Sequence, residues 1–273
     1  MDARSGQSAS IWMQTATVPS YAKLTGDIKA DVCVVGAGIA GMTTAYLLAR
    51  EGRSVVVIDD GPIGGGQTER TTAHLANAID DQYFEIERFH GERGAQLAAE
   101  SHTAAIDRIE KIVTREKIDC DFERLNGYLF LPPNESTDLL DRELAAAHRA
   151  GLTDVERVDR APLEQFDTGP CLRFPRQGQF HPLKYLAGLS SAITRDGGRI
   201  FTGTHAVDID GGSPGRVRTS DGFVITASAL VVATNTPVND RVAIHTKQAA
   251  YLTYVIGARV AHGSINKALY WDT

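Results

Sequence analysis

The sequence predicts an α/β protein in which a doubly wound domain, built on parallel strands, is interleaved with a second, α+β domain. Two observations predict this fold class. A unit of strand, glycine turn, helix and strand stands between residues 31 and 60. A long stretch of helix and mixed sheet then separates this unit from a β-rich region at 199–234, so the regular strand–helix repeats of a simple parallel sheet are missing.

Three glycines follow the first apolar run of this unit. The run covers residues 32–35 and predicts a strand buried on both faces. Of Gly36, Gly38 and Gly41, the first makes a tight turn, the second lets backbone approach a pyrophosphate, and the third lets the next helix pack closely. That helix is predicted over 39–50, and its unpaired N–H groups would point at the pyrophosphate.

A second apolar run, at 54–58, ends in two acids. Asp59 stands 18 residues after Gly41, where a carboxylate can accept hydrogen bonds from a ribose 2′-OH. The glycines alone are weak evidence, but strand, glycines, helix, strand and acid in this order predict a Rossmann-like nucleotide site. The glycine- and hydroxyl-rich loop at 61–75 is predicted to contact the ligand, with an ordinary connection as the alternative.

Composition excludes several other classes of function. The net charge of −6 argues against a nucleic-acid partner. No apolar run approaches the roughly 18 residues that span a bilayer, and residues 1–30 carry no secretory signal. Cys33, Cys120 and Cys171 fit no metal spacing and do not pair evenly, which favours a reducing cytoplasm.

The rest of the chain is predicted from periodicity and from turn residues. Helices are expected at 83–117 (divided near Gly91 and Gly94), 135–150 and 182–195. His181, before a proline, is interpreted as a loop or cap residue rather than a catalytic one. Strands are expected at 128–131, 172–180, 199–202, 205–209, 217–219, 223–226, 229–233 and 249–260.

Five segments together resemble the D-amino-acid-oxidase-like (DAO) family of FAD-dependent oxidoreductases, which includes glycine oxidase and sarcosine oxidase. They are Val34–Gly41, Ile58–Gly61, Gly64–Leu75, His205–Val207 and Leu230–Thr234. The resemblance implies a Rossmann-like, doubly wound FAD-binding domain interleaved with an α+β substrate domain. We expect a lead-in at 1–27, an FAD-binding domain at 28–80 and 182–240, and a substrate domain at 81–181 and 241–273, incomplete at its C-terminus.

The resemblance also implies roles at matching positions. Asn235 departs from the family's usual glycine after Ala-Thr. Near the flavin ring, His74 and Tyr251 are the two catalytic candidates, and each is more simply structural. The implied FAD contacts are Gly36, Gly38, Ile39, Ala40 and Gly41 at the pyrophosphate, Asp59 and Asp60 at the ribose, Gly66, Thr68, Ala73, His74 and Leu75 beside the phosphates and isoalloxazine, Ala206 at the adenine, and Ala233 and Thr234 over the nucleotide.

Three segments resemble a bacterial subgroup in which a Rieske [2Fe–2S] domain follows the flavin domain: Arg70–Leu75, Gln179–Tyr185 and Asn239–Arg241. A Rieske site needs two Cys-x-His pairs, and the sequence has none. The family's usual C-terminal stretch is also missing. The resemblance therefore predicts that this chain is the N-terminal portion of a longer protein.

The resulting functional hypothesis is FAD-dependent oxidation of a C–N bond in a small amine or amino acid. Hydride would pass from the substrate carbon to flavin N5, and water would hydrolyse the imine product. The electron acceptor would be oxygen or a Rieske centre in the missing part. Two alternatives remain open: a truncated, non-catalytic nucleotide-binding fragment, and an NAD-dependent dehydrogenase, against which the lack of regular crossovers argues.

Overall fold

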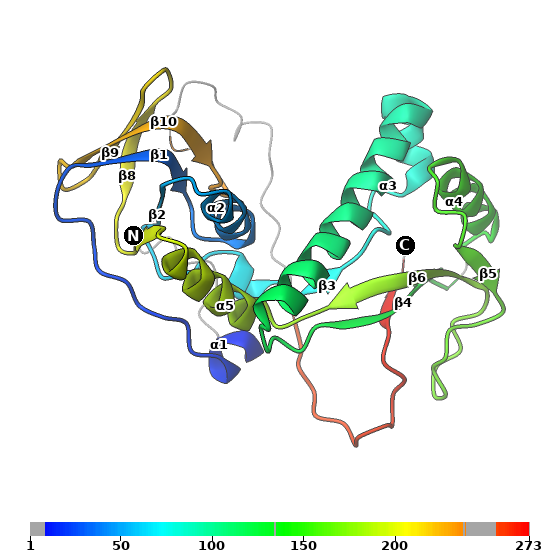
Figure 1. Cartoon of the computed structure of the whole chain (residues 1–273). Coiled ribbons are helices and arrows are strands. Elements are labelled where there is room, and N and C mark those ends of the chain that lie inside the picture. The colour runs from blue at the N-terminus through cyan, green and yellow to red at the C-terminus, as the bar shows by residue number, and fades with distance from the viewer. Residues whose placement is uncertain (1–8, 134, 237, 239–254, 273) are drawn as a thin grey trace. The chain divides into compact units, whose positions relative to one another are not determined.

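The computed structural model describes residues 9–133, 135–236, 238 and 255–272. The chain forms two compact units, each described here by itself (Figure 1). Unit 1 comprises Met1–Thr72, Ile118–Cys120 and His181–Gly257, and unit 2 comprises Ala73–Lys117, Asp121–Phe180 and Ala258–Thr273.

Unit 1 is built on a six-stranded sheet with the strand order β7-β2-β1-β10-β9-β8. The strands β7, β2, β1 and β10 run parallel, while β8, β9 and β10 form an antiparallel meander. All four residues of β2 and the last four of β1 are buried, as their apolar runs predict. The strands are β1 Ile28–Val35, β2 Val55–Ile58, β7 Arg199–Phe201, β8 Ala206–Asp210, β9 Gly215–Thr219 and β10 Val224–Val232.

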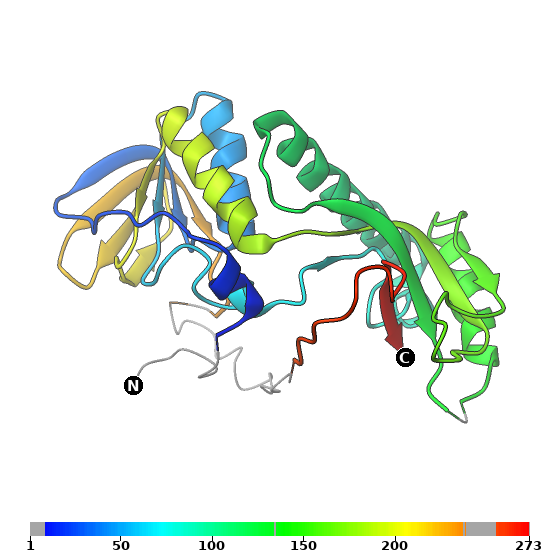
Figure 2. The same cartoon turned by 90° about the horizontal axis from the view of Figure 1, so that it is seen from below.

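Two helices of unit 1 pack against each other, α2 (Ile39–Arg50) and α5 (Pro182–Arg195) (Figure 2). The predicted cap role of His181 is confirmed, because its side chain accepts the N–H of Lys184 at the start of α5. Pro182 is the first residue of α5. Proline is favoured in the first turn of a helix because an N–H there would lack an intrahelical partner. Unit 1 also contains the short α1 (Ile11–Thr15) and the 3-10 turn η1 (Thr68–Arg70).

Two strand predictions in this part of the chain are wrong. The segments 223–226 and 229–233 are one continuous strand, β10, because residues 225–227 and 229–232 pair with β1 in the same register. Polar Ser228 therefore does not break the strand, since the ladder of β1 continues past it. The strand expected at 249–260 falls partly outside the described residues, and its described part, 255–260, has no strand structure.

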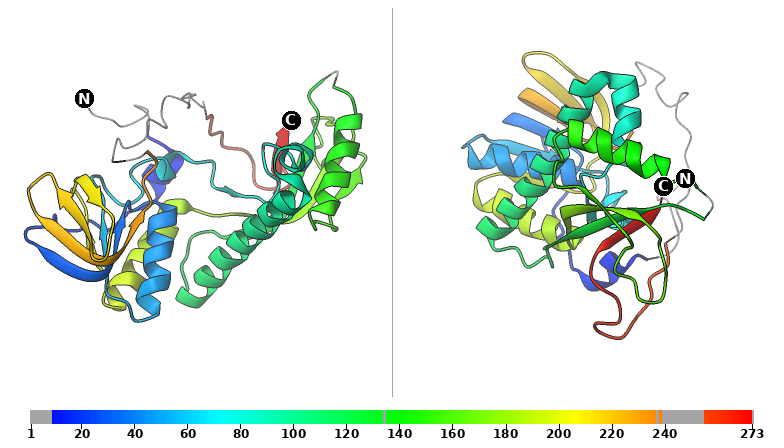
Figure 3. Two further views of the ribbon diagram at one scale, coloured as in Figure 1. Left: turned by 90° about the horizontal axis from the view of Figure 1, so that it is seen from above. Right: turned by 90° about the vertical axis from the view of Figure 1, so that its right-hand side faces the viewer.

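Unit 2 is built on a five-stranded sheet in which β11, β4, β6 and β3 lie in that order and β5 pairs with β6. Helices α3 (Tyr83–Glu116) and α4 (Asp138–Arg149) share one apolar cluster with β4 and β6 residues such as Leu129 and Phe174 (Figure 3). The strand β11 was not predicted, and it pairs in parallel with β4. The strands are β3 His74–Leu75, β4 Glu123–Phe130, β5 Glu156–Val158, β6 Cys171–Gln179 and β11 Leu269–Asp272.

The start of α3 is fastened to α4 by a buried carboxylate. Glu143, only 1% exposed, accepts the backbone N–H groups of Tyr83 at 3.0 Å and Phe84 at 3.3 Å. These two groups would otherwise lack partners at the helix N-terminus. The predicted division of the helical stretch is confirmed at Gly91, whose φ of 72° interrupts the helix, whereas Gly94 lies inside its second part.

No helix in the described part of the chain is both long and apolar enough to cross a membrane.

Candidate cofactor site

The turn between β1 and α2 requires glycine at two positions. Gly36 has a φ of 110°, and a Cβ on it would lie 2.6 Å from the carbonyl oxygen of Ala233. A Cβ on Gly41 would lie 1.9 Å from the carbonyl oxygen of Gly36. Real Cβ atoms do not approach other heavy atoms so closely, so the first and last glycines are needed for the turn to close onto the helix and the end of β10.

The N-terminus of α2 presents backbone donors without a side-chain cap. Gly38 is its N-cap residue, and the helical hydrogen bonds begin with the N–H of Met42 donating to the carbonyl of Gly38. The first turn contains no acidic residue. The N–H groups of Ile39 and Ala40 therefore lie at the positive end of a 12-residue helix, an arrangement that favours an anionic ligand.

The carboxylate of Asp59 joins two backbone turns. Its Oδ2 accepts the N–H of Ala37 at 2.6 Å, and its Oδ1 accepts the N–H of Gly61 at 2.8 Å. Burial raises the pKa of Asp59, and the neighbouring charge of Asp60 raises it further. The two hydrogen bonds lower this pKa but do not outweigh burial. Each carboxylate oxygen has a second lone pair, so Asp59 can also accept hydroxyl groups from a ligand.

The segment between β7 and β8 contacts both Asp59 and Asp60. The carbonyl of Asp59 accepts the N–H of Thr204 at 2.8 Å, and His205 Nδ1 lies 3.4 Å from a carboxylate oxygen of Asp60. The next residue, Ala206, is buried and pairs with Thr219 of β9. Ala206 thus directly follows the two residues that contact the acids after β2.

The loop after β2 is hydrogen-bonded to the glycine turn. Gly64 donates its N–H to the carbonyl of Ala37 at 3.0 Å. A Cβ on Gly38 would lie 3.3 Å from the hydroxyl of Thr68, which places this hydroxyl beside the start of α2. Gly66 lies exposed in the same loop. On the other side, Ala233 donates its N–H to Val35 at 2.8 Å and leads into Thr234.

Unit 1 therefore brings together most of the residues that the resemblance assigns to the cofactor, at the carboxyl ends of β1, β2 and β10. Ligands bind at this edge of open α/β sheets. The hydrogen-bonding groups fit FAD: an uncapped helix N-terminus donates to its pyrophosphate, and a carboxylate accepts from its ribose hydroxyls. The side-chain-free turn at Gly36 and Gly41 fits the close approach of backbone to the nucleotide.

Ala73, His74 and Leu75 belong to unit 2. There His74 and Leu75 pair with Gln179 and Gly178 of β6. His74 is an exposed residue. Partial desolvation of its imidazole ring by neighbouring protein atoms lowers its pKa. Tyr251 and the segment 239–241 lie outside the described residues.

The sequence did not predict the contacts that hold Thr71 and Asn77, which flank residues 73–75. The indole N–H of Trp12 donates to the carbonyl of Thr71 at 2.8 Å. In unit 2 the side chains of Asn77 and Gln177 are buried, and the amide of Gln177 both accepts the backbone N–H of Asn77 and donates to its side chain, each at 2.8 Å. These partners lie 59 and 100 positions apart, so no local pattern signals them.

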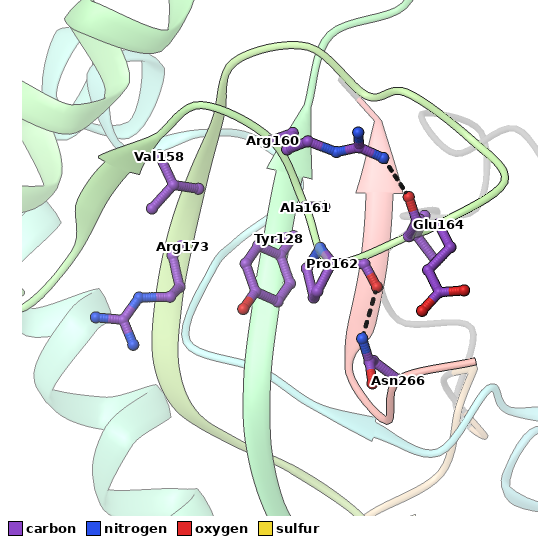
Figure 4. Close-up of a pocket in the computed structure, with 9 residues that line it drawn as sticks. Tyr128, Val158, Arg160, Ala161, Pro162, Glu164, Arg173 and Asn266 are labelled. Atoms are coloured by element: carbon purple, nitrogen blue, oxygen red, sulfur yellow. Dashed lines mark hydrogen bonds between the residues drawn. The ribbon is translucent and has the colours of Figure 1, made fainter. Parts of the chain in front are cut away.

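Unit 2 also contains an open pocket of about 510 Å³ on the side of its sheet opposite to α3 and α4 (Figure 4). The ring of Tyr128 stacks on Tyr270 at 5.7 Å and contributes to the wall. Arg160 donates to the carbonyl of Leu163, and Arg173 pairs with Glu156 at 2.8 Å. Both guanidinium groups of the pocket thus have acceptors within unit 2.

No group of three or more His, Cys, Asp or Glu side chains gathers as a metal site among the residues that the structure describes.

Two curated relatives cover most of this chain. The Bacillus subtilis (strain 168) protein named "Putative Rieske 2Fe-2S iron-sulfur protein YhfW" is 32% identical over 229 residues, which cover 84% of this chain and 45% of that protein. Gamma-glutamylputrescine oxidoreductase of Escherichia coli (strain K12) is 31% identical over 225 residues, which cover 80% of this chain and 52% of that enzyme. The chain spans about half the length of both relatives.

Solved structures share the fold at lower identity. Glycine oxidase from Geobacillus kaustophilus superposes with a TM-score of 0.62 at 21% identity, covering 76% of this chain and 55% of that one. This likeness shows the fold alone, and it confirms the predicted fold class. The family model described as "FAD dependent oxidoreductase" (DAO) matches residues 31–256. The chain therefore belongs to the DAO family of FAD-dependent oxidoreductases.

Proposed function

We propose that unit 1 binds FAD and that unit 2 is a substrate domain, in an enzyme that oxidises a C–N bond of a small amine or amino acid. The observation that carries the proposal is the turn from Gly36 to Gly41, with the carboxylate of Asp59 fastened to it. Both features serve a nucleotide: the turn leaves room for a pyrophosphate, and the carboxylate can accept ribose hydroxyls.

Each part of unit 1 has a role in this proposal. Backbone N–H groups at Gly38, Ile39 and Ala40 bind the pyrophosphate, and Asp59 orients the ribose. When bound, FAD supplies a two-electron acceptor for the hydride of a substrate carbon. The further residues of unit 1 proposed to line the cofactor are Asp60, Gly66, Thr68, Ala206, Ala233 and Thr234.

The proposed substrate class rests on the Escherichia coli relative, whose name states that it acts on gamma-glutamylputrescine, an amine. His74 is the described candidate for proton handling. Its lowered pKa keeps the imidazole neutral at pH 7, so a ring nitrogen can accept a proton there. The name of the Bacillus subtilis relative supports a Rieske centre as the electron acceptor, with oxygen as the alternative.

Competition binding separates this proposal from an NAD-dependent dehydrogenase. The purified chain is dialysed against FAD in the presence of excess NAD, and the bound flavin is measured. We expect NAD to leave FAD binding unchanged. Displacement of FAD by NAD, or retention of NAD alone, would contradict the cofactor assignment.

Anaerobic reduction separates an enzyme from a non-catalytic nucleotide-binding fragment. The FAD-loaded chain is mixed with a panel of primary and secondary amines and amino acids, and the flavin absorbance near ~450 nm is followed. Bleaching by a member of the panel is the expected result. A loaded protein whose absorbance no member changes would favour the non-catalytic alternative.

A further inference from the structure

We infer that Trp12 is a positioning residue for the loop at 64–72, and that it sets the position of this loop beside the N-terminus of α2. One consequence of this position, tighter FAD binding, rests on the proposed function. Trp12 lies in α1, and its contacts with Thr71 and His181 lie within unit 1.

The loop lies where a cofactor bound at the glycine turn would meet it. Its first residue, Gly64, donates to the carbonyl of Ala37, and the hydroxyl of Thr68 lies next to Gly38. The loop also packs on α5, since a Cβ on Gly64 would come within 2.8 Å of a methyl group of Leu183. A shift of the loop would therefore change the space at the start of α2.

Trp12 holds the far end of this loop. Its indole N–H, a donor only, lies 2.8 Å from the carbonyl oxygen of Thr71. Its ring lies edge-on to the ring of His181, with 4.9 Å between the ring centroids and 68° between the planes. The first contact fixes the carbonyl of the loop, and the second fixes the indole.

His181 is itself fixed by a chain of hydrogen bonds. Its Nδ1 accepts the N–H of Lys184 at 3.3 Å, so Nε2 carries the ring proton of the neutral imidazole. The hydroxyl of Thr15 donates to the carbonyl of Ile11 at 2.6 Å and thus accepts from Nε2 at 3.0 Å. The loop is consequently tied through Trp12 and His181 to the start of α5, which packs on α2.

Burial in the core does not explain the position of helix α1, because none of its residues is buried. It has five residues, and Ile11 and Met13 are exposed. Such a short helix is not stable alone, so its contacts must hold it. Its side-chain contacts with distant parts of unit 1 include those of Trp12 with Thr71 and His181 and of Thr15 with His181. Gln14 donates only to the nearby carbonyl of Ala9 among the hydrogen bonds of the described residues.

Hydrogen exchange of the chain without FAD tests the positioning directly. The reporters are the N–H groups of Glu69 and Arg70, which donate within the loop to Gly64 and Gln67. In Trp12→Phe the ring remains and the donor is lost, and we expect these amides to exchange about two- to tenfold faster. Peptides from β1 and β2 should be unchanged, which a general loss of stability would not allow.

The chain offers a matched control, because its second tryptophan, Trp271, lies in unit 2 over Gly127. Trp271→Phe should leave exchange of the loop unchanged. Thr15→Val removes the acceptor of His181 and should accelerate exchange in the loop as Trp12→Phe does. Unchanged exchange at 68–72 in both Trp12→Phe and Thr15→Val would overturn the inference.

FAD titration then separates the two proposals. If the wild type binds FAD, Trp12→Phe should raise its Kd about two- to tenfold, with Trp271→Phe as the control. Faster loop exchange in a chain that binds no FAD would support the positioning role and contradict the proposed function. FAD binding with loop exchange and Kd unchanged in Trp12→Phe would overturn the positioning role alone.

Discussion

The backbone N–H of Ala37 donates to Oδ2 of Asp59 at 2.6 Å, so the residue that follows β2 orders the turn that follows β1. The same carboxylate holds the N–H of Gly61 at 2.8 Å. The acid of the nucleotide motif thus has a structural role within the protein, in addition to the ribose contact that we propose for it.

Replacing this acid by its amide tests both roles. An Asn side chain has one acceptor oxygen, so in Asp59→Asn one of the two N–H groups would face an N–H donor. We expect the free energy of unfolding in urea to fall by about 1–2 kcal/mol, and FAD binding to weaken. The matched control is Asp60→Asn, because Asp60 is exposed. Equal stability of the two variants would contradict the account of Asp59.

A charge placed at the start of α2 tests the pyrophosphate site, and the amide of the same shape is its matched control. Gly38 has φ −79° and ψ −173°, which any residue can adopt, and Asp and Asn are good N-cap residues. Gly38→Asp and Gly38→Asn should both fold with stability within a few tenths of a kcal/mol of each other.

The two variants differ in charge, and their FAD affinities should differ accordingly. Repulsion between unit charges 4 Å apart costs about 1 kcal/mol in water and about 4 kcal/mol near a protein surface. We expect Gly38→Asp to bind FAD at least about tenfold more weakly than Gly38→Asn in a fluorescence titration. Equal Kd values would show that no phosphate lies at this helix N-terminus.

The buried carboxylate of Glu143 predicts a specific dependence of stability on pH. Burial raises its pKa above 4.5, against the effect of the two N–H groups that it accepts. Between 4.5 and the raised value, the folded state binds a proton that the unfolded state has lost, so the stability contributed by Glu143 falls as pH rises through this window.

Urea unfolding of wild type and Glu143→Gln between pH 4 and 8 measures this effect. The difference in unfolding free energy, wild type minus variant, should decrease with rising pH inside the window and stay level above it. An increase with pH would mean that the N–H groups of Tyr83 and Phe84 outweigh burial and lower the pKa.

Trp271 leaves no room for a side chain at Gly127. A Cβ there would lie 2.3 Å from Cη2 of the indole. Gly127→Ala should therefore reduce the free energy of unfolding by about 1–3 kcal/mol. In a Trp271→Ala background the same substitution should cost at least about 1 kcal/mol less, as a double-mutant cycle would measure. Additive effects would contradict the contact between β4 and β11.

Local sequence patterns predicted the part of the fold that carries the motif. Helix α2 matches its predicted range, β1 includes its predicted buried run, and β2 covers its predicted run except Ser54. Helix periodicity, buried apolar runs and glycine spacing are local features of the sequence. The division of α3 at Gly91 has the same origin, since only glycine adopts its φ of 72° without strain.

Features that depend on distant partners could not be predicted in this way. The strand at Leu269–Asp272 depends on pairing with β4, some 140 residues earlier in the chain. The continuity of β10 depends on β1, and Trp12 has its partner at Thr71. Local propensity does not encode pairing between distant residues, so these features could not be predicted from composition or motif spacing.

The visible spectrum of the purified chain after incubation with excess FAD and desalting tests the central claim most directly. We predict retained absorbance peaks near ~370 and ~450 nm, as expected of a flavin held by protein. A colourless, folded chain would contradict the claim that unit 1 of this chain binds FAD.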